Sequence, residues 1–194
     1  MMNVSTSRLH VAAELFRPSL VYPSHPYDEL LTRTAQHFPE NEAVIFKNIN
    51  LSYRELDALV NAIANALLDL GIRKGQKVCL FMTNRAEYLV SWFAITRIGA
   101  TVSPMNPSYK EREVAYQMSN SEAVAIVVQH DLLPLVEAVR DTTPDLKYVI
   151  VVGADQQMLP ASTHSFGQLV QTHPPTLPLG VERAWEDTIA LPYS

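Results

Sequence analysis

The feature that most constrains this chain is a helix-to-strand junction near its middle, at residues 92–107. Apolar residues three apart predict one buried face at the end of a helix: Trp92, Ile95 and Ile98. Gly99 follows at the position where a left-handed C-cap is favoured. Pro104 and Pro107 exclude a helix across the exit from the strand that comes next. The junction is typical of proteins in which helices alternate with strands.

The strongest helix prediction covers residues 52–71. Ser52 and Glu55 form a capping box at its start, and Gly71 ends it. Its apolar face consists of Leu56, Leu59, Val60, Ile63, Ala64, Leu67 and Leu68. Burying this face is worth roughly 10 kcal/mol before conformational entropy is subtracted, at about 1.5–3 kcal/mol for each large side chain. The helix therefore requires a sheet to pack on.

Strand and helix patterns alternate after this helix. The predicted strands cover residues 77–82, 100–103, 123–128 and 147–152, and the predicted helices cover 85–98, 110–119 and 131–140. Asp131 is the expected N-cap of the last helix, with Pro134 in its first turn. These spacings suit right-handed crossovers and predict an α/β fold, a mostly parallel sheet with flanking helices.

The chain divides into segments of different texture. They are an N-terminal arm (1–23), an α/β subdomain (24–153), a Pro-rich linker or surface excursion (154–186) and one more strand segment (187–194). The subdomain opens with a helix after Ser24 and a hairpin of residues 43–46 and 50–53. The apolar stripe of that helix comprises Tyr27, Leu30, Leu31, Thr34, Ala35 and Phe38. Within the excursion, only residues 166–170 look helical.

Composition excludes several classes of protein. The chain has 194 residues, of which 47% are hydrophobic, so a sizeable core is expected and disorder is not. Fifteen basic against twenty acidic residues give a net charge of -5 without a basic cluster, which disfavours nucleic acid as a partner. There is no transmembrane segment and no secretory signal by pattern. With Cys79 as the one cysteine, a cytoplasmic location is expected.

Residue chemistry alone supplies candidate sites but no activity. Neither common glycine-rich phosphate loop is present, and the six histidines are scattered, so no metal site is predicted. We interpret Cys79 as a buried inert thiol, Trp92 and Phe93 as core, and residues 111–113 as a solvated helix start. Asn84-Arg85 lies at the carboxyl end of a predicted strand, where α/β sheets often bind ligands, although a helix N-cap with a solvated arginine is favoured.

Short motifs recur in a fixed order along the chain. They include Tyr22-Pro23 with residues 26–46, Leu51–Asp57, Leu70–Val78, Asn84 with Glu87, and Ile98–Ala100 with Pro104, Asn106-Pro107 and Glu113. Each motif alone is weak, but their order and spacing resemble the N-terminal part of the adenylate-forming acyl-CoA synthetases. Within these, the opening resembles the long-chain fatty-acid–CoA ligases. The resemblance covers roughly residues 20 to 152 and again residues 187 to 194.

The resemblance implies a ligase that works in two steps. ATP activates a fatty or other carboxylic acid as an acyl-adenylate, and CoA then displaces AMP. Mg²⁺ and a Ser/Thr/Gly-rich loop ending in lysine handle the phosphates. Residues 187–194 are then a strand that leads into this ATP/Mg²⁺ loop, which would begin at Ser194, the single residue assigned to cofactor binding. No catalytic residue and no metal ligand is assigned, because their counterparts would come after Ser194.

Two hypotheses about function stay open. In the first, the chain is the N-terminal part of an acyl-CoA ligase whose cofactors are ATP, Mg²⁺ and CoA, and the isolated 194 residues are inactive. In the second, it is a stand-alone, non-catalytic binding or dimerisation module derived from such a ligase. A flavodoxin-like nucleotide domain has only the fold in its favour. Under the first hypothesis, the partners are the remainder of the ligase and, as an open option, a second copy of the chain.

The first hypothesis also predicts self-association. Sheet and helix faces that the rest of a ligase would cover are exposed in an isolated segment, and exposed apolar patches associate. We expect the sedimentation coefficient of the 194-residue chain to rise with concentration. A monomer that melts in one sharp, cooperative transition at high concentration would contradict this expectation.

Overall fold

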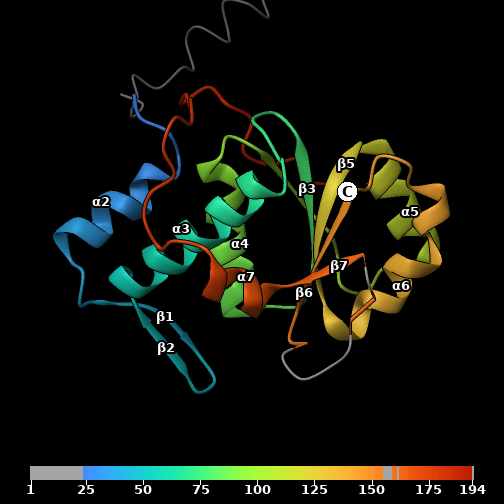
Figure 1. Ribbon diagram of the computed structural model, residues 1–194, viewed down its shortest axis with the longest axis horizontal. Coiled ribbons are helices and arrows are strands. Elements are labelled where there is room, and N and C mark those ends of the chain that lie inside the picture. The colour runs from blue at the N-terminus through green and yellow to red at the C-terminus, as the bar shows by residue number, and fades with distance from the viewer. Residues whose placement is uncertain (1–23, 155–158, 161, 194) are drawn as a thin grey trace, which may run out of the picture.

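A five-stranded sheet forms the centre of the computed structural model, which describes residues 24–154, 159–160 and 162–193 (Figure 1). Its strands are β3 (Lys77–Phe81), β4 (Thr101–Pro104), β5 (Ala123–Gln129), β6 (Tyr148–Val152) and β7 (Thr163–Ser165). They lie in the order β4-β3-β5-β6-β7, and every neighbouring pair is parallel. The predicted α/β fold with a mostly parallel sheet is confirmed.

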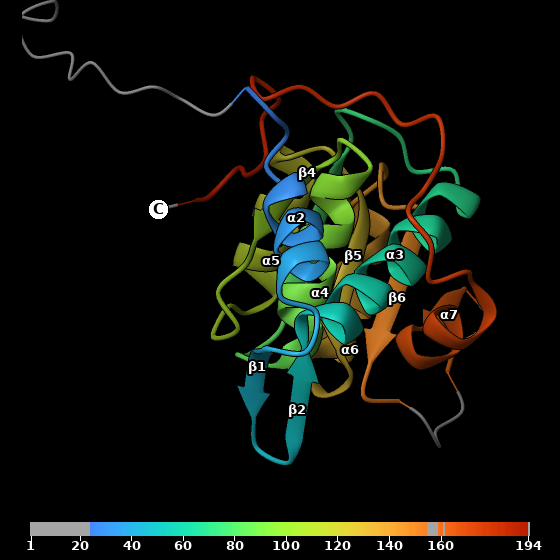
Figure 2. The same cartoon turned by 90° about the vertical axis from the view of Figure 1, so that its left-hand side faces the viewer.

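Helices cover both faces of the sheet (Figures 1 and 2). One face carries α3 (Tyr53–Asp69), α4 (Ala86–Arg97) and α7 (Phe166–Thr172), with α2 (Glu29–His37) outside them. The other face carries α5 (Glu111–Asn120) and α6 (Leu133–Ala138), the latter flanked by the 3-10 turns η1 (His130–Leu132) and η2 (Arg140–Thr142). Val78 and Leu80 of β3 enter the first core, while Cys79 and Phe81 enter the second. Because both faces are covered, the central strands β3, β5 and β6 are mainly apolar.

The α3 helix has the capping box that its sequence predicts. The Ser52 backbone N–H donates to Glu55 Oε2 at 2.8 Å, and the Glu55 N–H donates to Ser52 Oγ at 3.3 Å. These bonds to Ser52 lower the pKa of the Glu55 carboxyl from its usual value. Gly71 follows the helix with a φ of 90°. The helix boundaries are therefore determined by local hydrogen bonds and by backbone conformation.

The predicted hairpin is also present. Strand β1 (Glu42–Phe46) pairs antiparallel with β2 (Ile49–Ser52), and Phe46 lies opposite Ile49. The turn between them consists of Lys47 and Asn48, and Lys47 takes the left-handed conformation with a φ of 52°. A tight two-residue turn demands this backbone, so it is adopted although Lys47 carries a Cβ.

Two predictions about helices are wrong in part. In α2 only Leu31 is buried, while Leu30 and Phe38 are each 57% exposed. Most of the apolar stripe is exposed because α2 is an outer helix, which packs on the layer of helices beneath it and has nothing among the described residues over its other side. Asp131 does not cap a helix over 131–140: it lies in η1, and α6 begins at Leu133 with Pro134 in its first turn. The sequence pattern joined a 3-10 turn and a short helix into one element.

The 154–186 segment contributes to the sheet. Residues 166–170 are helical as predicted, but the linker interpretation missed β7, which pairs parallel with β6. The β7 sequence, Thr-His-Ser, is polar and three residues long, so it carries no apolar signal. Residues 188–191 run beside β4 and form one parallel bridge, between Ala190 and Val102, rather than a full strand. The N-terminal arm, residues 1–23, lies outside the described residues.

Gly99 offers a test of the helix-to-strand junction. Its φ is 70°, and a Cβ added there would lie 3.0 Å from Lys74 Cγ. Gly180 has the same φ of 70° with nothing within 4 Å, so it is the matched control. We expect Gly180→Ala to cost about 1 kcal/mol from left-handed strain, and Gly99→Ala to cost more because Lys74 must also move. Urea denaturation measures both, and equal losses would contradict the crowding at Gly99.

Candidate functional site

The strand order places a crevice at the carboxyl ends of β3 and β5. The chain leaves β3 through α4 toward β4, and it leaves β5 through α6 on the opposite face toward β6. The two neighbouring strands thus send their connections in opposite directions. In open α/β sheets, ligands bind in the crevice at such a switch point.

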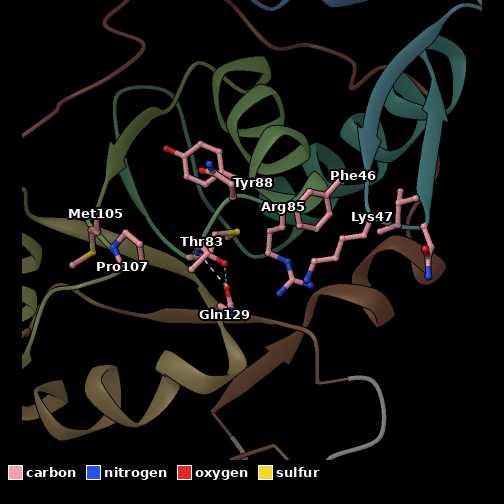
Figure 3. Close-up of a pocket in the computed structure, with 12 residues that line it drawn as sticks. Phe46, Lys47, Thr83, Arg85, Tyr88, Met105, Pro107 and Gln129 are labelled. Atoms are coloured by element: carbon pink, nitrogen blue, oxygen red, sulfur yellow. Dashed lines mark hydrogen bonds between the residues drawn. The ribbon is translucent and has the colours of Figure 1, made fainter.

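A cavity of about 920 Å³ lies at this edge (Figure 3). The last residue of β5 and residues that follow β3 and β4 line it, together with the tip of the β1–β2 hairpin. The lining residues are Phe46, Lys47, Asn48, Ile49, Met82, Thr83, Asn84, Arg85, Tyr88, Met105, Pro107 and Gln129. Segments far apart in the sequence therefore form one site, of a size that accommodates a small organic ligand.

Thr83 and Gln129 tie the two strands together at the cavity. The Thr83 hydroxyl donates to Gln129 Oε1 at 2.7 Å, and the Thr83 backbone N–H donates to the same oxygen at 3.2 Å. The amide of Gln129 thus holds the loop after β3 against the end of β5.

Arg85 and Glu87 form a bidentate pair at the start of α4. Arg85 Nε and Nη2 donate to the two Glu87 carboxylate oxygens at 2.9 and 2.8 Å. Burial raises the pKa of Glu87, but the bonds to Arg85 outweigh it and leave this pKa below its usual value. Glu87 is therefore ionised at neutral pH, and it keeps the Arg85 guanidinium in a fixed orientation at the cavity.

Lys47 brings a second positive charge to the cavity. Its Nζ lies 5.3 Å from the centroid of the Phe46 ring, and in Figure 3 its side chain extends toward the part of the cavity that Arg85 also lines. With aromatic rings and two cationic side chains, the cavity suits an anionic ligand that has an apolar portion. In the described part of the chain, no group of three or more His, Cys, Asp and Glu side chains could hold a metal ion.

The structure brings some of the predicted site residues together and separates others. Asn84 and Arg85 line the cavity, but Arg85 rather than Asn84 is the N-cap of α4, and its guanidinium binds Glu87 instead of being simply solvated. Glu113 at the start of α5 accepts a hydrogen bond from the Lys110 N–H at 3.0 Å. Ser194 lies outside the described residues, so its assignment stays a prediction.

Sequence reasoning missed Lys47 and Gln129. Gln129 could have been found, because it ends β5, a strand that the sequence predicts. Parallel strands present their carboxyl ends at one edge of the sheet, where ligands bind. Lys47 carries no such signal, because only tertiary packing brings the hairpin turn to the sheet. No helix among the described residues is long and apolar enough to cross a membrane.

Comparisons with known proteins give consistent matches. The model of the AMP-binding enzyme family matches residues 31–194. A crotonobetaine/carnitine–CoA ligase of Escherichia coli is 32% identical over 140 residues, which is 71% of this chain and 26% of that protein. The chain therefore spans about a quarter of the length of this curated relative.

Solved structures of CoA ligases share the fold. The anthranilate CoA ligase AuaEII in complex with anthranoyl-AMP matches with a TM-score of 0.82 at 26% identity, over 90% of this chain and 33% of that one. A long-chain-fatty-acid–CoA ligase from Archaeoglobus fulgidus matches with a TM-score of 0.79 at 24% identity, over 91% and 36% of the two chains. The second likeness is one of fold alone.

Cys79 provides a chemical test of the sheet interior beside the site. The side chain is fully buried, and burial raises the pKa of its thiol to about 12. Alkylation requires the thiolate, so iodoacetamide at pH 8 should leave the folded chain unmodified. The same chain in concentrated guanidinium chloride is the control and should be fully alkylated, as read by intact mass. Rapid alkylation of the folded chain would show that the face of β3 that carries Cys79 is not packed under α5 and α6.

Proposed function

Because this chain belongs to the AMP-binding enzyme family, we propose that it forms the N-terminal part of an ATP-dependent acyl-CoA ligase. The observation that carries the proposal is the family match over residues 31–194. The similarity to an anthranilate CoA ligase, in fold and at 26% identity, supports it. Because the chain spans 26% of its curated relative, activity is proposed for a longer protein of which this chain is a part.

The proposed reaction has two group transfers. In the first, a carboxylate oxygen of the acid attacks the α-phosphorus of ATP, which forms an acyl-adenylate and releases pyrophosphate. In the second, the CoA thiolate attacks the acyl carbon, which forms the thioester and releases AMP. Mg²⁺ would neutralise charge on the phosphates, as bound cations and preorganised donors do in such transfers. Ser194 is proposed as the first residue of the phosphate-binding loop.

The cavity at the switch point is the proposed contribution of the described residues. Arg85 and Lys47 give it a positive mouth, and ATP and CoA both carry phosphates. Glu87 would keep the Arg85 guanidinium in place while a ligand enters. The role assigned to these side chains is binding and orientation, with no proton transfer.

The acid is proposed to be a fatty acid. The support is the resemblance of residues 22–46 to the opening of the long-chain ligases. The similar proteins include ligases of carnitine, anthranilate and long-chain fatty acids, so the shared feature is a carboxylate joined to CoA. We also propose a cytoplasmic location, because the one cysteine, Cys79, is free, as expected in a reducing compartment. A homodimer is the proposed oligomeric state.

Pyrophosphate exchange tests the proposed function. The pure 194-residue chain should not exchange labelled pyrophosphate into ATP, because most of a ligase of this family would lie outside it. The longer protein should exchange pyrophosphate only when an acid is added, and fatty acids of different length should identify the preferred substrate. Acid-dependent exchange by the 194-residue chain alone would contradict the proposal that this chain is inactive. Absence of exchange by the longer protein would contradict the proposal that it is a ligase.

The stand-alone module is the second candidate. The observation in its favour is that the described residues have their own buried cores on both faces of the sheet. The intact mass of the native gene product separates the two. A mass near 21.7 kDa would favour the module, and a much heavier product would favour a ligase of which this chain is the front part.

A further inference from the structure

An extended segment, residues 173–187, runs over the outer helices and is called the strap here. In Figure 2 it is the red coil segment that passes outside α3 and over the top of the molecule before it turns down. It begins after α7 and leads to residues 188–191, which lie beside β4. The strap therefore decides from which direction the chain approaches this edge of the sheet.

Polar contacts rather than apolar burial hold the strap. Pro178 is its one buried residue, while Leu179 is 93% exposed and Trp185 is 52% exposed. At its start, Asn61 Nδ2 donates to the Pro175 carbonyl at 3.2 Å, and Asn65 Nδ2 donates to the Thr176 carbonyl at 2.8 Å. A segment held in this way depends on each of its few bonds.

The central contact of the strap is an ion pair between Arg183 and Asp28. Asp28 is 1% exposed and precedes α2, and Arg183 Nη1 donates to its Oδ2. Arg97 Nε also approaches Oδ2, but at 3.4 Å, and Asp28 Oδ1 has no partner among the described residues. Arg183 is thus the principal partner of a buried carboxylate, and its loss would leave that charge poorly compensated.

The end of the strap is held more weakly. Lys74 Nζ lies 2.8 Å from Asp187 Oδ2, but the Lys74 side chain is 45% exposed, and such a pair contributes little. The contacts of the following residues with β4 are few. They include Val102 N–H to the Ile189 carbonyl at 2.9 Å, Leu191 N–H to the Val102 carbonyl at 2.8 Å and Thr101 Oγ1 to the Thr188 carbonyl at 2.9 Å. A longer bond runs from Ser103 Oγ to the Leu191 carbonyl at 3.5 Å.

We propose that Arg183 is a positioning residue: by binding Asp28 it holds the strap on the outer helices, and thereby keeps residues 188–191 aligned with β4. The aligned segment leads through Tyr193 to Ser194, the proposed first residue of the phosphate-binding loop. In this one respect the inference rests on the proposed function. The alignment itself is a property of the chain. Arg183 acts through Asp28 and the strap, and it touches no reacting group.

Amide hydrogen exchange on the 194-residue chain tests the proposal. The informative amides are those of Val102 and Leu191, which bond across the edge, and the reference amide is that of Val127 inside the sheet. Arg183→Gln should speed exchange at Val102 and Leu191 at least about tenfold and leave Val127 unchanged, because the opening is local. The matched control is Arg33→Gln, which removes the exposed pair of Arg33 with Glu29 on α2. It should change none of the three amides.

A conservative variant separates positioning from general stabilisation. Arg183→Lys retains a charge that can reach Asp28, so it should restore most of the protection at Leu191. If Arg183→Gln does not fold, Arg183→Lys takes its place as the test. A smaller acceleration of exchange at Val102 and Leu191 is then expected. Unchanged exchange at Leu191 in the glutamine variant would overturn the proposal, and so would equal acceleration of Val127. Exchange is read without ATP or acid, so these outcomes are independent of the pyrophosphate assay.

Discussion

The buried guanidinium of Arg97 is the interaction on which the described structure depends. Its side chain is fully buried, and it donates to Asn61 Oδ1 at 2.6 Å, to Asp57 Oδ1 at 2.9 Å and to Thr32 Oγ1 at 2.9 Å. These acceptors come from α2 and α3, so a residue of α4 joins three helices. An unpaired charge at this depth costs several kcal/mol, and the helices must therefore keep the spacing that satisfies it. Burial also raises the pKa of Asp28, although Arg183 and Arg97 both act to lower it.

Helix α4 transmits this constraint to the candidate site. Its N-cap, Arg85, lines the cavity and is held by Glu87 in the first turn, and its last residue is Arg97 in the buried cluster. Gly99 then turns the chain into β4 with a left-handed backbone. Because a helix is rigid along its axis, the position of Arg97 among α2 and α3 also determines where Arg85 lies relative to the end of β3. Core packing and site geometry are therefore coupled through one element.

Much of the fold could be predicted because its signals are local. The capping box of Ser52 and Glu55 and the left-handed Gly99 each depend on residues within a few positions. The strands of the sheet centre are apolar on both faces, which sequence shows directly. The polar strand β7 and the exposure of Leu30 in α2 could not be predicted, because both depend on which layer lies next to them. In the site, the Asn84-Arg85 position followed from the end of a strand, whereas Lys47 did not.

By itself, the sequence determined the alternation of helix and strand, the boundaries at caps and glycines, and the family motifs, since periodicity and capping act over distances of about one helical turn. Tertiary structure alone decided that Arg97, which reads in the sequence as a basic residue in the last turn of a helix, is a buried hub. It also decided the partner of Arg183, because Asp28 lies 155 residues away along the chain. The packing of the helix and sheet layers decides which charges meet over such a separation. Because a buried charge without a partner is costly, burial then makes those pairings obligatory.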